Sequence, residues 1–168
     1  MGIAGSIQRF LDTHGTPYDI VRHPRTSSSY ASAKAAHVSP ERVAKGVLLK
    51  TYSDYLLAVL PASRRLDLHW LIDEVEHELE LASEDELAKI FFDCAHGAVP
   101  AIGPAYGLQT LVENCLRAQP ELYFEAGDHE ELVRVKESDY ETLLGVVRFL
   151  TFTHLLDDSE VRARPIFE

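Results

Sequence analysis

The chain has 168 residues, of which 46% are hydrophobic and 26% charged, and its net charge is −11. These values are typical of one folded globular domain and exclude a disordered or low-complexity protein. No run reaches the roughly 20 apolar residues of a membrane span, and the first residues lack the pattern of a signal peptide. With only two cysteines as well, we expect a cytoplasmic protein.

The charge is distributed unevenly along the chain. Up to and including Arg65 there are nine Lys and Arg residues against four Asp and Glu, a net charge of +5. The following 103 residues carry seven basic residues against 23 acidic ones, a net charge of −16. Because clustered positive charge attracts phosphates, we expect an anionic ligand to approach the N-terminal part.

Short helices and strands are predicted in the first part of the chain. Apolar spacing indicates a helix over residues 3–13 that ends at Gly15, and Ser39-Pro40 is typical of a helix start. Further segments are a strand at 18–21, a helix at 30–37, and strands at 43–51 and 55–62. The last two strands are almost wholly apolar, so we expect a hairpin that is covered on both faces.

The second part of the chain predicts further short elements. Ser83 and Glu86 form the pattern of a capping box, which starts a helix that runs to Ile90. Other expected segments are a helical face at 66–75, a Gly/Pro-rich loop at 92–107, strands at 109–112, 122–125 and 131–136, and a helix from Ser138 to about Phe152. This order predicts an α/β (mixed α+β) fold, a single compact domain over 1–150 with a central mixed, largely antiparallel sheet flanked by helices, and a C-terminal tail over 151–168.

Lys45 is unusual because it lies inside a strand that is otherwise apolar. Lysine is rarely buried without a partner, and the neighbouring Gly46 leaves room for a ligand to approach the backbone. The alternative is a lysine at the strand entrance whose ammonium reaches solvent. Lys50, at the other end of the strand beside a polar turn, is where an ordinary solvated lysine is expected.

The loop from Gly97 to Gly103 contains two glycines and a proline within seven residues. Such a backbone can present N–H groups to an anion or to a developing oxyanion, although a wide turn with no ligand has the same composition. Cys94 and His96 are too few for a metal site, so we expect no metal and no cofactor. A hydrolase with Cys94 as nucleophile is a further alternative, but the sequence identifies no residue to orient the pair.

Five segments, in this order and at this spacing, resemble the YbaK and prolyl-tRNA-synthetase-associated editing-domain family. They are His23-Pro24, Ser39 to Lys45, Leu57 to Leu68, Leu81 to Ser83, and the Gly97 loop. The resemblance runs from about Leu11 to Leu144. It implies a YbaK-like domain that acts as a free-standing deacylase, hydrolysing the ester of a mischarged tRNA, typically a proline tRNA that carries the wrong amino acid.

The resemblance also implies roles for individual residues. Lys45 is the functional signature of the family and would be the catalytic-site residue that positions the substrate's negatively charged end. The loop residues Gly97, Ala98, Val99, Pro100 and Ala101 would line the aminoacyl pocket, together with His129. The expected partners are the acceptor end of a mischarged tRNA and an aminoacyl-tRNA synthetase, with no membrane.

Three positions depart from the family pattern. The proline of the loop, Pro100, is in the fourth position and Ala101 occupies the fifth. Gly46 stands where some members have a polar residue, and Val21 where some have tyrosine. Because each change removes bulk or polarity near the expected pocket, Gly46 and Val21 are predicted to affect which amino acid is removed. A catalytically silent module that binds a tRNA end or a synthetase is the alternative function.

Overall fold

The computed structural model describes residues 2–162. The helices are α1 (Gly5–His14), α2 (Ser29–Ala35), α3 (Leu68–Val75), α4 (Glu84–Ile90), α5 (Glu137–Leu144) and α6 (Asp158–Arg162), with 3-10 turns η1 (Pro40–Arg42), η2 (Gly103–Tyr106) and η3 (Asn114–Ala118). The strands are β1 (Asp19–Arg22), β2 (Val43–Lys50), β3 (Tyr55–Pro61), β4 (Arg64–Leu66), β5 (Glu80–Leu81), β6 (Gln109–Glu113), β7 (Glu121–Glu125), β8 (Glu131–Lys136), β9 (Arg148–Leu150) and β10 (Thr153–Leu155).

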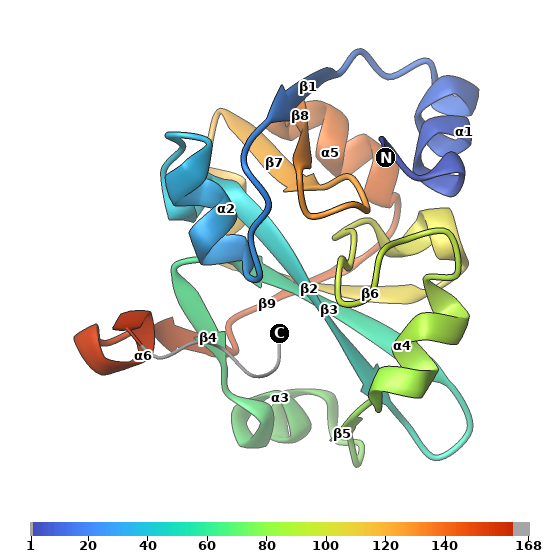
Figure 1. Cartoon of the computed structure of the whole chain (residues 1–168). Coiled ribbons are helices and arrows are strands. Elements are labelled where there is room, and N and C mark those ends of the chain that lie inside the picture. The colour runs from blue at the N-terminus through green and yellow to red at the C-terminus, as the bar shows by residue number, and fades with distance from the viewer. Residues whose placement is uncertain (1, 163–168) are drawn as a thin grey trace.

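The main sheet has the strand order β1-β8-β7-β2-β3-β6-β9, and β5 also pairs with β2. The pairs β2–β7, β3–β6 and β6–β9 are parallel, and the other four pairs are antiparallel. Figure 1 shows the long β2–β3 hairpin crossing the centre of the molecule. The prediction of a mixed sheet in a single α/β domain is therefore confirmed. Antiparallel pairs only slightly outnumber parallel pairs.

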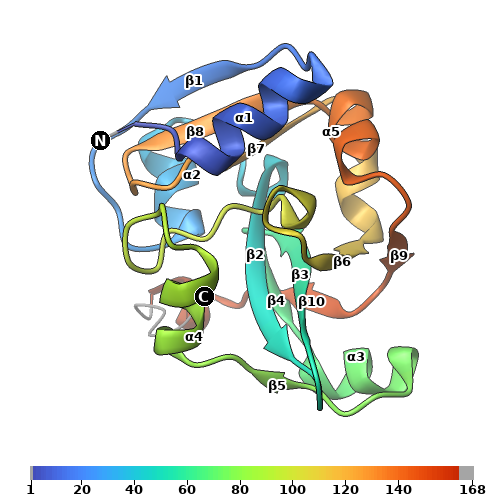
Figure 2. The same ribbon diagram turned by 90° about the vertical axis from the view of Figure 1, so that its right-hand side faces the viewer.

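Both faces of the central hairpin are covered, as its apolar run predicts. On one face Ala44 and Leu48 of β2 belong to a core cluster that also contains residues of α1 and α5. On the other face Val47 and Leu49 pack in a second cluster with Leu71 of α3. Figure 2 shows α1 and α5 together beside β7 and β8, with α3 at the opposite end of the molecule.

Local sequence signals set several element ends. Gly15 ends α1 in the left-handed conformation, with φ of 62°. Ser83 and Glu86 form the predicted capping box at the start of α4, each side chain accepting the other residue's backbone N–H. The segments predicted as strands and helices before Ser138 are each found within a few residues of their expected ends.

The prediction of one helix from Ser138 to about Phe152 is wrong. Helix α5 ends at Leu144 because Gly145 has φ of 70°, and the apolar residues beyond it form β9 beside β6. Phe152 is fully buried, and β10 pairs with β4 in a separate two-stranded sheet. The chain therefore packs into the fold to at least Leu155, beyond the predicted start of the tail at residue 151. The tail residues 163–168 lie outside the described residues.

Within residues 2–162, no helix combines the length and the hydropathy that a membrane crossing needs.

Candidate active site

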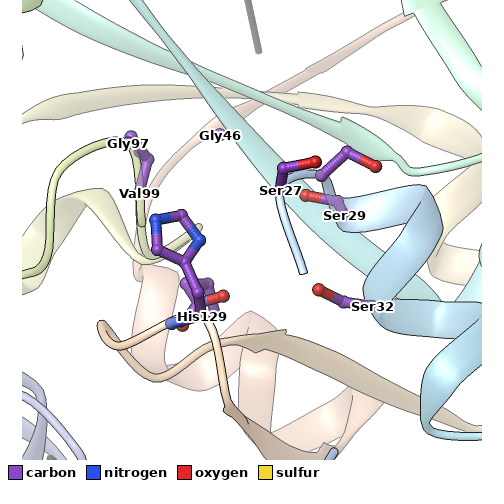
Figure 3. A pocket seen from close by; sticks show the side chains of 9 residues that line it. Ser27, Ser29, Ser32, Gly46, Gly97, Val99 and His129 are labelled. Carbon is purple, nitrogen blue, oxygen red and sulfur yellow. The ribbon is translucent and has the colours of Figure 1, made fainter. Parts of the chain in front are cut away.

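A small open cavity lies where the loop before α2, strand β2, the loop after α4 and the β7–β8 turn meet (Figure 3). It encloses about 330 Å³ when the solvent-filled space at its open mouth is included, so the site is a shallow depression. The lining residues are Ser27, Ser28, Ser29, Ser32, Gly46, Gly97, Val99, Glu125 and His129. Most of them are polar or have no side chain, so the site is suited to a small, polar group.

Gly46 lines the cavity with backbone atoms alone because it has no side chain. A Cβ atom at this position would lie 3.0 Å from Cδ1 of Leu57 and 3.2 Å from Cγ1 of Val99. Val99 belongs to the loop after α4, so that loop packs closely on the β2–β3 hairpin at Gly46. The absence of a side chain therefore preserves both the packing and the space of the site.

Glu125 holds the turn between β7 and β8 in shape. Its Oε1 atom accepts the backbone N–H groups of Gly127, Asp128 and His129 at 2.9, 3.0 and 3.1 Å. These three hydrogen bonds all converge on one carboxylate oxygen, and they fix His129 in the left-handed conformation with φ of 64°. Glu125 thereby places the imidazole of His129 at the cavity.

The imidazole of His129 connects the two loops that border the cavity. Its Nε2 atom lies 2.6 Å from the carbonyl oxygen of His96. Because a carbonyl oxygen can only accept, Nε2 carries the proton, and Nδ1 of the neutral ring is therefore an acceptor. Figure 3 shows this second nitrogen on the side of the ring that faces Ser27 and Ser32.

The loop before α2 forms the opposite wall. Ser28 caps α2 by accepting the backbone N–H of Ala31 at 3.0 Å, and the hydroxyls of Ser32 and Thr26 are 2.6 Å apart. Thr26 also donates its backbone N–H to the carbonyl of His129 at 3.2 Å. The serine wall is therefore linked by hydrogen bonds to the turn that carries His129.

Lys45 precedes Gly46 on β2 and does not line the cavity. Successive side chains of a strand point to opposite faces, so Lys45 shares a face with Val43 and Val47, and Gly46 shares one with Ala44. Lys45 is half-buried. The side chain of Lys45 therefore leaves β2 on the face opposite the cavity. A group bound across the edge of the strand could contact both Lys45 and the cavity.

The structure brings four of the predicted site residues together at the cavity, namely Gly46, Gly97, Val99 and His129. The others are nearby or elsewhere. Ala98, Pro100 and Ala101 are buried, and Ala101 accepts a hydrogen bond from the hydroxyl of Tyr140 in the core. Val21 packs against the cluster beneath α2. None of these four lines the cavity.

The Gly97 loop uses some of its own backbone donors. Ala98 donates to the carbonyl of Ala95 at 3.0 Å, and Val99 donates to the carbonyl of Gly97 at 3.1 Å. Within residues 2–162, no hydrogen bond occupies the N–H of Gly97, which has φ of 76°. Of the three amides, that of Gly97 is therefore the one best able to meet a ligand oxygen at the cavity.

Cys94 lies outside the cavity, in contact with Tyr106 and Asp93. Its Sγ atom is 3.3 Å from the hydroxyl of Tyr106 and 3.7 Å from a carboxylate oxygen of Asp93. Burial, with the nearby carboxylates, raises the pKa of Cys94 to about 12. His96 instead contacts Glu84 at 3.0 Å. A protonated thiol without the histidine as partner argues against Cys94 as a nucleophile.

No group of three or more His, Cys, Asp and Glu side chains in the described part of the chain is arranged to hold a metal ion. The sequence interpretation did not identify Glu125 or the serines of the cavity. Glu125 ends a strand and the serines precede a helix, and both are common places for solvated polar residues. The signal that was available is the segment Glu125 to His129, where a glycine and two acidic residues precede the histidine.

Comparison with solved structures identifies proteins of the same fold. A candidate trans-editing enzyme for prolyl-tRNA synthetase is 22% identical with a TM-score of 0.77, covering 89% of this chain and 95% of the other. A hypothetical protein is 16% identical with the same TM-score, covering 89% and 99%. A candidate signal transduction protein from Marinobacter aquaeolei VT8 is 17% identical with a TM-score of 0.71, covering 88% of this chain and 30% of its own.

No curated protein matches the chain by sequence. The family model of the aminoacyl-tRNA editing domain matches residues 23–143, which is most of the chain. The matched region begins at His23 and includes Lys45, the Gly97 loop, Glu125 and His129. The chain therefore belongs to the aminoacyl-tRNA editing domain family.

Proposed function

We propose that this protein is a trans-acting deacylase that hydrolyses the ester of a mischarged tRNA, with proline tRNA as the first candidate. The observation that carries the proposal is the cavity itself. It joins Gly46 of β2, the Gly97 loop and His129 at one small polar site, inside the region that matches the editing-domain family. In this proposal the aminoacyl group enters the open mouth of the cavity, and the rest of the tRNA stays outside.

Lys45 is proposed to position the tRNA end. The ester lies on the terminal ribose, next to a phosphate, and a lysine ammonium is a compact charge that binds phosphate well. Lys45 and Gly46 are consecutive on β2, so a terminal nucleotide that crosses this strand can place its phosphate beside Lys45 and its aminoacyl group in the cavity. Lys45 is thus a substrate-positioning cation, not the nucleophile.

Two groups of the cavity suit the hydrolysis of an ester. The N–H of Gly97 can stabilise the carbonyl oxygen as it gains negative charge. Because Nε2 of His129 donates to the carbonyl of His96, Nδ1 is the acceptor of the tautomer without a second proton. Nδ1 lies on the cavity side, where it can take a proton from water or from a hydroxyl of the ribose. Water then attacks the carbonyl carbon, the bond to the ribose oxygen breaks as that oxygen takes up the proton held by His129, and the amino acid leaves with a free carboxylate. An ester needs no covalent intermediate for this reaction.

A panel of tRNAs charged with different amino acids tests the proposal. We expect the purified protein to release the amino acid from one or a few of them, and most readily from a mischarged proline tRNA. Correctly charged prolyl-tRNA serves as the control substrate and should persist. Binding to charged tRNAs without turnover of any would contradict the proposal and favour the catalytically silent module.

The same proposal makes tRNA binding depend on the basic N-terminal part. Lys34 of α2 is exposed, and Arg25 precedes the serine wall and donates to the carbonyl of Asp128 at 3.3 Å. Affinity for tRNA should fall as salt rises, because bound phosphates release counterions. The strongly acidic remainder suggests that a synthetase supplies further tRNA contacts. An affinity that does not change with salt would contradict this binding face.

A further inference from the structure

We propose that Glu125 binds the α-ammonium group of the aminoacyl ester, so that the site accepts substrates with a free amino group and discriminates against those without one. This inference rests on the proposed deacylase function and specifies its substrate class. It starts from the charge of the cavity. Among the nine lining residues, Glu125 is the only acid and there is no Lys or Arg.

The geometry of Glu125 leaves one of its carboxylate oxygens for a ligand. The three backbone N–H groups of the β7–β8 turn all bind Oε1, and no hydrogen bond within residues 2–162 uses Oε2. The side chain is half-buried and the turn holds it rigidly. A fixed carboxylate of this kind can bind a cationic donor without losing further side-chain entropy.

Neighbouring groups also favour a donor as ligand. The Nδ1 atom of His129 is an acceptor on the cavity side when the ring is neutral, because Nε2 donates to the carbonyl of His96. The serine hydroxyls of the opposite wall can accept as well. An ammonium group has three N–H donors, which the carboxylate of Glu125 and the serine hydroxyls can accept, so that Nδ1 of His129 stays available to the reacting water or ribose hydroxyl. A phosphate or a carboxylate would instead be repelled by Glu125.

Glu125 therefore has two effects, and they can be separated. Its Oε1 atom shapes the turn, and its charge would bind the substrate. In Glu125→Gln the amide oxygen can still accept the three N–H groups while the charge is lost. Glu130→Gln makes the same substitution in the same turn at an exposed residue outside the cavity, and is the matched control.

The test uses 3′-amino-3′-deoxyadenosine whose amino group is joined to alanine by an amide bond. The amide replaces the ester, so that binding is measured without turnover. A second compound carries lactyl in place of alanyl, which exchanges the ammonium for a hydroxyl of nearly the same size. We expect the wild type and Glu130→Gln to bind the alanyl compound about tenfold more tightly than the lactyl compound, as measured by calorimetry. In Glu125→Gln the two affinities should agree within about twofold.

Two results would overturn the inference: a wild type that does not prefer the alanyl compound, or a preference that persists in Glu125→Gln. Failure of the alanyl compound to bind would overturn it as well. The expected preference together with no hydrolysis of any charged tRNA would support the ammonium site and contradict the deacylase. Circular dichroism melting curves of both variants check that the turn is intact.

Discussion

Strand β2 carries a lysine near its start and another at its end, and the surroundings of the two lysines differ. Lys50 lies beside two carboxylates, with Nζ 3.1 Å from Glu80 and 3.3 Å from Glu86, and their hydrogen bonds raise the pKa of Lys50. Lys45 is followed by Gly46, which opens the cavity. The Lys50 end is thus explained by a partly buried ion-pair network, whereas the Lys45 end borders a site that can hold a ligand. Residue type alone does not separate structural from functional lysines.

The largest expected effect is that of removing Lys45, with the removal of Lys50 for comparison. Lys45→Ala should lower kcat/KM for a mischarged tRNA by about 100-fold, because the substrate phosphate loses its positioning charge. Lys50→Ala is the matched control on the same strand and should stay within about twofold of wild type. Single-turnover hydrolysis of charged tRNA measures both. If both variants lose activity equally, the contrast between the two ends of β2 is wrong.

Gly46 allows a second, smaller test at the cavity end. In Gly46→Ala the new Cβ would crowd Leu57 and Val99, with a stability cost of about 1 kcal/mol and a narrower cavity. We expect kcat/KM to fall by about tenfold, mainly through KM. Denaturant unfolding measures the stability cost, and hydrolysis assays measure kcat/KM and KM.

Val99→Ala provides the control for this substitution. It removes the methyl group that lies 3.2 Å from the added Cβ, so the double variant should recover part of the activity that Gly46→Ala loses. Val99→Ala alone should have little effect on kcat/KM, since it enlarges the cavity. A double variant no more active than Gly46→Ala would show that the space between these two residues does not limit the substrate.

The contrast between the ends of β2 also indicates which features the sequence could predict. The apolar runs of β2 and β3 and the capping box of α4 are local signals, and the structure confirms them. Strand β9 was missed because its apolar residues fit the preceding helical pattern, and its partner β6 is more than 30 residues away in sequence. Pairing over such a distance depends on tertiary contacts that periodicity does not contain.

The site was predictable to a similar extent. Glycines beside Lys45 and in the Gly/Pro-rich loop pointed to Gly46 and Gly97, and the resemblance to the editing-domain family pointed to His129. These residues meet at the cavity. Glu125 could not be inferred in this way, because an acid at a strand end is ordinary unless the path of the following turn is known. Strand alternation predicts that Lys45 and Gly46 lie on opposite faces of β2. Which of the two lies at the cavity depends on the position of the Gly97 loop.

The smallest expected effect is at the Lys50 end, where Glu86 should affect stability and not catalysis. Backbone N–H donation from Ser83 and the hydroxyl of Tyr55 lower the pKa of Glu86 from its usual 4.5 to about 2. A carboxyl whose pKa is lowered on folding stabilises the protein above its unfolded pKa, and this contribution is lost as pH falls from about 4.5 to about 2. Glu86→Gln keeps the oxygen acceptor and removes the charge.

At pH 6 the Tm of Glu86→Gln should therefore lie about 2 °C below that of the wild type, and the difference should shrink steadily below pH 4.5. Glu78→Gln makes the same substitution at an exposed residue nearby and should show no such trend. Thermal melts at several pH values measure the difference, and kcat/KM at pH 7 should equal that of the wild type. A difference in Tm that is independent of pH would mean that the ionised carboxylate of Glu86 does not stabilise this end of β2. A loss of activity in Glu86→Gln would instead show that the two ends of the strand are coupled.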